Sequence, residues 1–171
     1  QKYSVQPLFS FAELPSERML FGCSYGISLS DNKSGKAEVL KSSFVAHDLI
    51  VIDNIAWIAT SGDGLIRFDL STKQQQEITT QDGLPTNFLN SIVQMDGFLW
   101  IGTENGLCKY DPDNNQVAVF TAIKSLSNVS FNRGAHCKLR NGKLAMGTSN
   151  GVVIFNPQTF QMAQPNGKIF F

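Results

Sequence analysis

Short hydrophobic runs alternate with polar turns along the whole chain, and apolar residues nowhere recur with the 3.6-residue period of an amphipathic helix. The clearest unit joins the apolar runs Phe98–Thr103 and Leu107–Asp111 through the turn Glu104-Asn105-Gly106. Asn-Gly between two such runs is a strong signal for a β-hairpin in which both turn residues adopt positive φ. Pro112 then ends the second strand, because proline has no backbone donor. The pattern therefore predicts an all-β chain of short antiparallel strands.

The same hairpin pattern occurs four times. Strong copies stand at residues 56–69 and 144–157, and a weaker copy stands at 19–30. The small residue that follows each apolar triplet lies at positions 22, 59, 102 and 147, so the intervals are 37, 43 and 45 residues. A period of about 40–50 residues with several strands per repeat indicates the blades of a β-propeller.

Each repeat is expected to supply four strands that pair as an antiparallel meander, and we predict about four blades in all. Gln1–Glu13 is a poorly patterned entry segment that precedes the first and weakest repeat. The predicted blades span approximately residues 1–42, 43–80, 81–122 and 123–163, and 164–171 would be an exit segment towards a following domain. The strands expected in the last three blades are 44–52, 55–60, 65–69, 76–79, 90–95, 98–103, 107–111, 117–120, 135–140, 143–148, 152–156 and 160–162.

Two tryptophans, Trp57 and Trp100, occupy the same register in the second strands of their repeats. Both faces of these strands are substantially apolar, as expected for sheets sandwiched between neighbouring sheets. Burial between blades is therefore favoured over a role as sugar-stacking platforms. The small residue two positions later would let another backbone approach closely.

Composition excludes several classes of function. Fourteen basic and fourteen acidic residues cancel, so the chain has no electrostatic footprint for nucleic acid or an anionic membrane. No apolar run approaches the roughly 20 residues of a membrane span. The chain starts without Met or a signal peptide, which predicts a mature product or a fragment. No cofactor and no metal site are predicted, and the three cysteines are expected to be buried thiols.

Residues 44–171 resemble the two-component regulator propeller repeat, and the first repeat does so loosely. The resemblance rests on Gln81-Asp-Gly-Leu-Pro-Thr-Asn87, on Trp100-Ile-Gly-Thr103 and on Gly106-Leu followed by Tyr110-Asp-Pro112. Residues 131–157 resemble the final blade of that family, after which the chain would leave for a β-sandwich. Ala59 and Ala145 depart from the usual glycine and aromatic residue.

The resemblance implies a function. The family builds the periplasmic sensors of hybrid histidine kinases, especially in gut Bacteroides, so this chain would be a ligand-sensing module of an inner-membrane receptor. The implied ligand is a small molecule or oligosaccharide, and the membrane would be reached only through the parent protein. Such propellers usually carry about seven blades, so four blades would be a fragment of a larger ring. Because an open arc exposes two blade faces, self-association or a dimer is expected.

Polar residues at the openings of the innermost strands are the candidate ligand site. In a sequence alignment of the repeats, Asn87 matches Asn132, and Ser91 matches both Asp48 and His136. Amides, imidazoles, a guanidinium and a carboxylate offer donors and acceptors suited to hydroxyl-rich ligands. The alternative for the asparagines is hydrogen bonding to turn backbones. The candidate ligand-binding residues are His47, Asp48, Asn87, Asn90, Arg133 and His136.

Two other functions compete with sensing. A propeller enzyme acting on glycans would need two carboxylates roughly 5–10 Å apart, and Asp48 is the single carboxylate among the inner-strand openings. No catalytic residue is therefore predicted, and the chain is expected not to be an enzyme. The third possibility is a scaffold whose blade faces or rim bind another protein.

Overall fold

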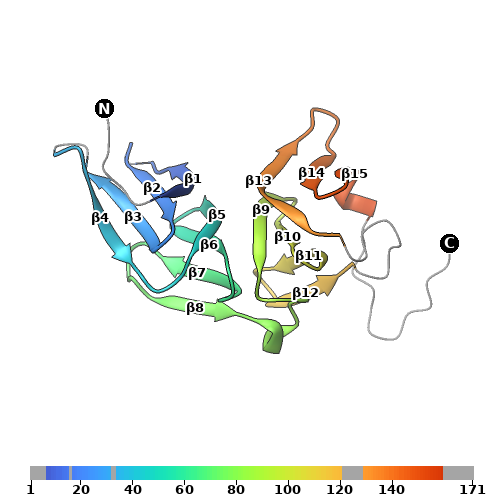
Figure 1. Cartoon of the computed structure of the whole chain (residues 1–171), viewed down its shortest axis with the longest axis horizontal. Coiled ribbons are helices and arrows are strands. Elements are labelled where there is room, and N and C mark those ends of the chain that lie inside the picture. Colours follow the sequence, from blue (N-terminus) through green and yellow to red (C-terminus); the bar gives the residue numbers. More distant parts are fainter. Residues whose placement is uncertain (1–6, 16, 32–33, 121–128, 160–171) are drawn as a thin grey trace.

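The computed structural model describes residues 7–15, 17–31, 34–120 and 129–159, which form four antiparallel sheets (Figure 1). Every strand pairs with its neighbour in sequence, so each sheet is a meander. The first sheet contains β1 (Leu8–Glu13), β2 (Met19–Cys23), β3 (Gly26–Asp31) and β4 (Lys36–Lys41); the second contains β5 (Ala46–Ile52), β6 (Ile55–Thr60), β7 (Leu65–Asp69) and β8 (Gln75–Ile78). The third contains β9 (Leu89–Met95), β10 (Phe98–Thr103), β11 (Gly106–Asp111) and β12 (Gln116–Val119); the fourth contains β13 (Phe131–Lys138), β14 (Leu144–Thr148) and β15 (Gly151–Phe155). Short 3₁₀ turns occupy Thr80–Asp82 and Pro157–Thr159.

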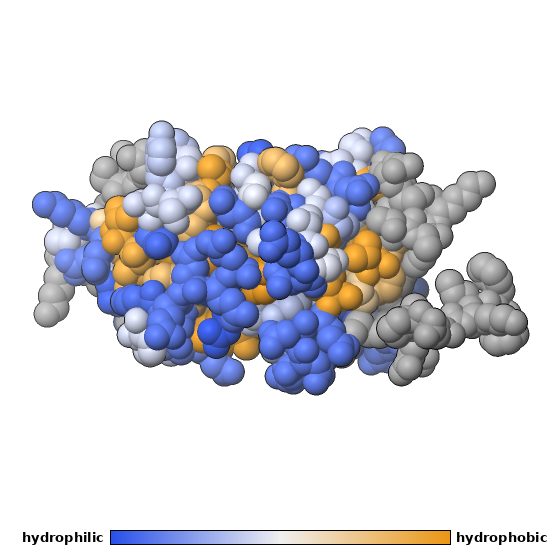
Figure 2. All heavy atoms as spheres, turned by 90° about the horizontal axis from the view of Figure 1, so that it is seen from below, coloured by the Kyte–Doolittle hydropathy of each residue, from blue (hydrophilic) through white to orange (hydrophobic). Residues whose placement is uncertain are grey.

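The four sheets are blades arranged in an arc. The first strand of each blade (β1, β5, β9 and β13) lies towards the middle of the arc, whereas β4, β8 and β12 lie at its periphery (Figure 1). Within the described residues, no strand pairing joins the first blade to the fourth. The rim seen from below, over β8 and β12, is mostly hydrophilic, with hydrophobic patches between the polar residues (Figure 2). The predicted all-β architecture of propeller blades is confirmed.

The poorly patterned entry segment contains a strand. Leu8–Glu13 forms β1, the innermost strand of the first blade, and it pairs with β2. Its pattern is weak because apolar residues on both faces remain exposed, so no clean alternation marks a buried side. The expected strand at 160–162 and the exit segment at 164–171 lie outside the described residues.

The hairpin turn between β10 and β11 also differs from the prediction. Gly106 has a φ of 93°, but Asn105 is not among the residues with positive φ. The side chain of Thr103 closes the turn instead: its Oγ1 donates to the Gly106 carbonyl at 2.8 Å and accepts from the Asn105 N–H at 3.0 Å. Thr60 and Thr148 close the equivalent turns of the second and fourth blades in the same way. In the β10–β11 turn, one left-handed glycine and one threonine therefore replace the expected pair of left-handed residues.

Hydrophobic residues pack between successive blades. Trp100 is 1% exposed and lies between the third and fourth blades, with its ring centroid 5.6 Å from that of Phe120 and 5.0 Å from that of Phe155. Trp57 lies between the second and third blades, against Tyr110. The predicted burial of both tryptophans is confirmed.

The small residue after each apolar triplet makes room for side chains of an inner strand. A Cβ atom on Gly102 would lie 2.6 Å from the Cβ of Phe131 on β13 and 2.5 Å from the Oγ of Ser91. A Cβ on Gly22 would lie 3.0 Å from the Leu49 side chain on β5. The close approach is therefore real, but its partners are side chains of inner strands rather than a backbone.

The cysteines do not all behave as predicted. Cys23 and Cys108 are buried, whereas Cys137 is exposed. Cys137 pairs with Ala145, which pairs with the exposed Ile154, so all three lie on the face of the fourth blade that is turned away from the third. Its exposure follows from its place on this outer face.

Candidate functional site

Two successive polar residues at the start of β5, His47 and Asp48, are almost fully buried at 2% and 5% exposure. Successive side chains of a strand point to opposite sides, so the two residues engage different partners. A buried polar group is costly unless it is hydrogen-bonded. Both residues meet this requirement through the inner strands of other blades.

Asp48 connects the inner strands of all four blades. Its Oδ1 accepts from the Ser10 hydroxyl on β1 at 3.0 Å and from its neighbour's N–H, that of Leu49, at 2.9 Å. Its Oδ2 accepts from the Ile92 N–H on β9 at 2.9 Å and lies 3.0 Å from Nε2 of His136 on β13. Four donors thus surround this carboxylate, as an ionised acceptor requires.

The contact with Asp48 also determines which ring nitrogen of His136 donates a hydrogen bond. An ionised carboxylate only accepts hydrogen bonds, so Nε2 of His136 carries the hydrogen that points at Asp48. Its Nδ1 forms no hydrogen bond with the described residues and is left for a further partner. His136 is half-buried, with 20% of its side chain exposed.

His47 forms a second connection between blades. Its Nδ1 faces two acceptors, the Leu89 carbonyl at 3.0 Å and Oδ1 of Asn90 at 3.1 Å, and therefore carries the hydrogen. The Asn90 amide in turn donates to the Phe131 carbonyl on β13 at 2.9 Å. Burial lowers the pKa of His47 below its usual value, although the hydrogen bond to Leu89 opposes this shift. The neutral imidazole thus belongs to a chain that links the second, third and fourth blades.

Arg133 bridges the first and fourth blades. Its guanidinium on β13 lies 5.8 Å from the centroid of the Phe9 ring on β1, within the range of a cation–π contact. The Phe9 ring meets the His47 ring edge-on at 6.2 Å and is itself 42% exposed. One layer of side chains therefore forms near the N-terminal ends of the inner strands, which we call their entry end. Each blade contributes one residue to it: Phe9, His47, Asn90 and Arg133.

The sheet registers explain this layer and correct the sequence alignment. Ser10, Asp48 and Ser91 each pair with the small residue of the second strand, so they are equivalent. In β9 three steps separate Leu89 from Ile92, whereas in β13 five steps separate the matching residues Phe131 and His136. His136 is therefore equivalent to Leu49 and Ile92, not to Asp48 and Ser91. Because β13 contains two additional residues, the imidazole of His136 reaches Asp48 from the register position that follows that of Asp48.

Asn87 is engaged elsewhere. Its Oδ1 accepts from the Thr80 N–H at 2.9 Å, and its carbonyl accepts from the N–H groups of Gly62 and Gly64, both at 3.1 Å. Asn132 likewise donates to the Thr148 carbonyl at 3.1 Å. Both asparagines therefore hydrogen-bond turn or strand backbones, which is the alternative that the sequence left open. Of the six candidates, the structure joins His47 to Asn90 and Asp48 to His136, and it places Arg133 beside them through Phe9.

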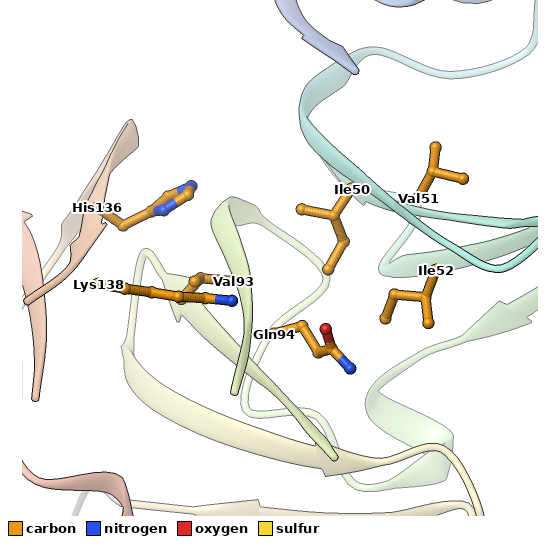
Figure 3. Close-up of a pocket in the computed structure, with 7 residues that line it drawn as sticks. All are labelled: Ile50, Val51, Ile52, Val93, Gln94, His136 and Lys138. Carbon is orange, nitrogen blue, oxygen red and sulfur yellow. The ribbon is translucent and has the colours of Figure 1, made fainter. Parts of the chain in front are cut away.

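A pocket of about 350 Å³ opens at the other end of the inner strands (Figure 3). Three strands line it, and of the six candidate residues it contains only His136. The sequence did not predict the other lining residues, because isolated aliphatic residues and a single lysine do not form a recognisable sequence motif. It also missed Phe9 and Ser10, because Leu8–Glu13 has no clean alternation of buried and exposed positions. The lining residues are Ile50, Val51, Ile52, Val93, Gln94, His136 and Lys138.

Among the described residues, no three His, Cys, Asp or Glu side chains are arranged to hold a metal ion. In the same part of the chain, no helix has the length and apolar character needed to cross a membrane.

Comparisons with known proteins agree with the predicted propeller fold. Residues 83–105 match the family model of the two-component regulator propeller, which confirms the resemblance seen in the sequence. No curated protein matches the chain. Several hundred solved chains are similar in structure.

Two similar structures are extracellular domains of BT4673 from B. thetaiotaomicron, described as a one-component system in one and a hybrid two-component system in the other. They share 21% and 20% identity, with TM-scores of 0.75 and 0.72 over 89% and 92% of this chain. This chain spans 21% and 22% of their length, about a fifth. The computationally designed Ika4 protein has a TM-score of 0.63 at 12% identity, with coverage of 91% of this chain and 97% of Ika4. At these identities the likeness shows the fold.

Proposed function

We propose that these blades belong to a ligand-sensing propeller of a hybrid two-component sensor. The module is extracytoplasmic, in the periplasm, and is not itself an enzyme; its parent protein passes the signal to a histidine kinase. The match at residues 83–105 and the likeness to extracellular domains of two-component systems support this proposal. The ligand is an oligosaccharide that binds at the entry end of the inner strands.

The observation that carries the ligand site is the layer formed by Phe9, His47, Asn90 and Arg133. An exposed aromatic face packs against the C–H groups of a sugar ring, and a guanidinium donates to its hydroxyl or acidic groups. Phe9 and Arg133 are both exposed. His47 and Asn90, the other two members of the layer, are buried and held by hydrogen bonds.

The same geometry offers a route for the signal. No strand pairing joins the first and fourth blades within the described residues, but Phe9 belongs to the first and Arg133 to the fourth. A ligand that contacts both side chains favours the arrangement in which these blades are close. Binding energy that differs between two arrangements shifts their populations, and this shift is the signal proposed to reach the kinase.

Calorimetry with a glycan identified from a binding array tests the proposal. Phe9→Ala and Arg133→Ala should each weaken binding, and Arg133→Ala should do so by about tenfold if the glycan is acidic, because guanidinium pairs with such groups bidentately. Arg140→Ala is the matched control, since Arg140 is exposed outside this layer. Equal affinity in all three variants and the unmodified chain would place the ligand elsewhere. Turnover of the glycan would instead reveal an enzyme.

A further inference from the structure

The pocket in Figure 3 is lined by the later residues of the inner strands, whereas Phe9 and Arg133 lie near the starts of β1 and β13. Its walls are the last residues of β5, the second half of β9 and the end of β13, so three blades contribute. Among the described residues, all seven that line the pocket belong to these three strands.

The charge in the pocket is positive. Among the described lining residues, Lys138 is the single lysine or arginine, and none is an aspartate or glutamate. Within the described residues, neither Lys138 nor Gln94 uses its side chain in a hydrogen bond. In Figure 3 the Lys138 side chain extends from β13 towards the side where Gln94 lies. An ammonium group and an amide donor are thus available at one side.

His136 adds a third polar group. Its Nε2 lies 3.0 Å from Oδ2 of the buried Asp48, and this contact orients the imidazole ring. Because Nε2 is engaged, Nδ1 is the atom of the ring that a ligand can contact. An orienting carboxylate behind a histidine is a common way to hold an imidazole in place for a ligand.

The remaining lining residues are aliphatic. Ile50 and Ile52 face Lys138 and Gln94 from across the pocket, and Val93 lies beside Lys138 (Figure 3). None of the described lining residues is Phe, Tyr or Trp, so they do not form the flat surface on which sugar rings stack. Its chemistry is that of a cationic end joined to an aliphatic wall.

We propose that this pocket is a second binding site, for a small organic carboxylate with an aliphatic body. The carboxylate pairs with the Lys138 ammonium group and accepts from the Gln94 amide, while the hydrocarbon part packs on Ile50 and Ile52. The site is separate from the oligosaccharide site proposed above and does not depend on it.

The test is a methyl NMR titration of the whole chain labelled at isoleucine methyl groups, with hexanoate as the probe and hexanamide as its uncharged match. Hexanoate should shift the methyl signals of Ile50 and Ile52, and hexanamide should bind more weakly. Lys138→Gln should raise the Kd for hexanoate by about fivefold, the upper range for one partly exposed ion pair. Lys36→Gln, which removes an exposed lysine from β4 of the first blade, should leave the Kd unchanged.

Three results would overturn this proposal: no shift at Ile50 and Ile52 up to the solubility limit of hexanoate, equal binding of hexanamide, or an unchanged Kd in Lys138→Gln. The spectrum of each variant without probe reports whether it is folded. Failure of the glycan experiment with Arg133→Ala would not affect these signals, so the two proposals can fail independently.

Discussion

Oδ2 of Asp48 lies 3.0 Å from Nε2 of His136, although the two residues are 88 positions apart and belong to the second and fourth blades. The same carboxylate accepts from Ser10 of the first blade and from the Ile92 N–H of the third. One buried side chain thus joins four sheets whose named strands, within the described residues, do not pair with one another. This arrangement makes Asp48 the most informative position for mutation.

Asp48→Asn should destabilise the fold by about 1–3 kcal/mol, because the amide nitrogen would replace an acceptor with a donor facing other donors. Urea unfolding followed by tryptophan fluorescence measures the change. Asp53→Asn is the matched control: Asp53 lies in the exposed β5–β6 turn with a φ of 54°, which asparagine tolerates, and its effect should stay within about 0.5 kcal/mol. Equal stability of both variants would contradict the role assigned to Asp48.

Gly102→Ala should destabilise the chain by about 1–3 kcal/mol through overpacking, because the new Cβ would lie 2.6 Å from that of Phe131. The coupling is tested by a double-mutant cycle with Phe131→Ala. Phe131→Ala keeps the Cβ of residue 131 but removes its Cγ, which would lie 2.8 Å from the new Cβ. Part of the clash should therefore be relieved, so the two changes should cost less together than the sum of their separate effects. Strict additivity of the two unfolding free energies would show that the clash is absorbed elsewhere.

The thiols should react at different rates. Cys137 is exposed, whereas complete burial raises the pKa of Cys108 to about 12 and burial also raises the pKa of Cys23. Since the thiolate is the reactive form, an aromatic disulfide reagent should modify one thiol rapidly in the folded chain and all three in denaturant. Cys137→Ser should abolish the rapid phase. Two rapid thiols in the native chain would contradict the burial of Cys23 and Cys108.

Acid should weaken the fold through His47. Burial lowers the pKa of this imidazole in the folded chain, so the unfolded chain takes up a proton at a higher pH than the folded chain does. The stabilising contribution is therefore complete above the unfolded pKa and is lost as the pH falls through the folded pKa. The urea midpoint should fall between about pH 7.5 and about pH 5, and His47→Gln should reduce this fall. An identical pH dependence in the variant would exclude His47 as its source.

Self-association should follow from the two outer faces of the arc. Val152 and Ile154 on the fourth blade are 67% and 57% exposed, and Phe11 and Val39 on the first blade are similarly exposed. We propose that a second copy of the chain covers these faces, since large exposed apolar patches favour association. Sedimentation equilibrium should give an apparent mass above 18.8 kDa that rises with concentration.

The double variant Val152→Asp, Ile154→Asp should lower that apparent mass towards the monomer, because each carboxylate would have to be buried in the interface. Asn150→Asp adds a charge in the exposed β14–β15 turn and serves as the control. A monodisperse monomer of the unmodified chain at all concentrations would refute this association.

The local sequence determined the blades. Ile55–Thr60 and Phe98–Thr103 could be located as strands because the alternation of apolar runs and tight turns is a property of neighbouring residues. The burial of Trp57 and Trp100 followed from the same repeat. A match between repeats needs no knowledge of distant contacts, so the fold class and the register of the second strands were accessible from the sequence.

The tertiary structure decided which polar residues meet. Two additional residues in β13 shift His136 relative to Asp48, and an alignment by residue count cannot see a bulge, because a bulge changes spacing without changing residue type. The role of Ser10 could not be predicted, because Leu8–Glu13 has no fully buried face that would mark it as a strand. The site depends on which side chains converge when four inner strands are brought together, and this convergence is set by contacts between blades, not by the pattern within any one of them.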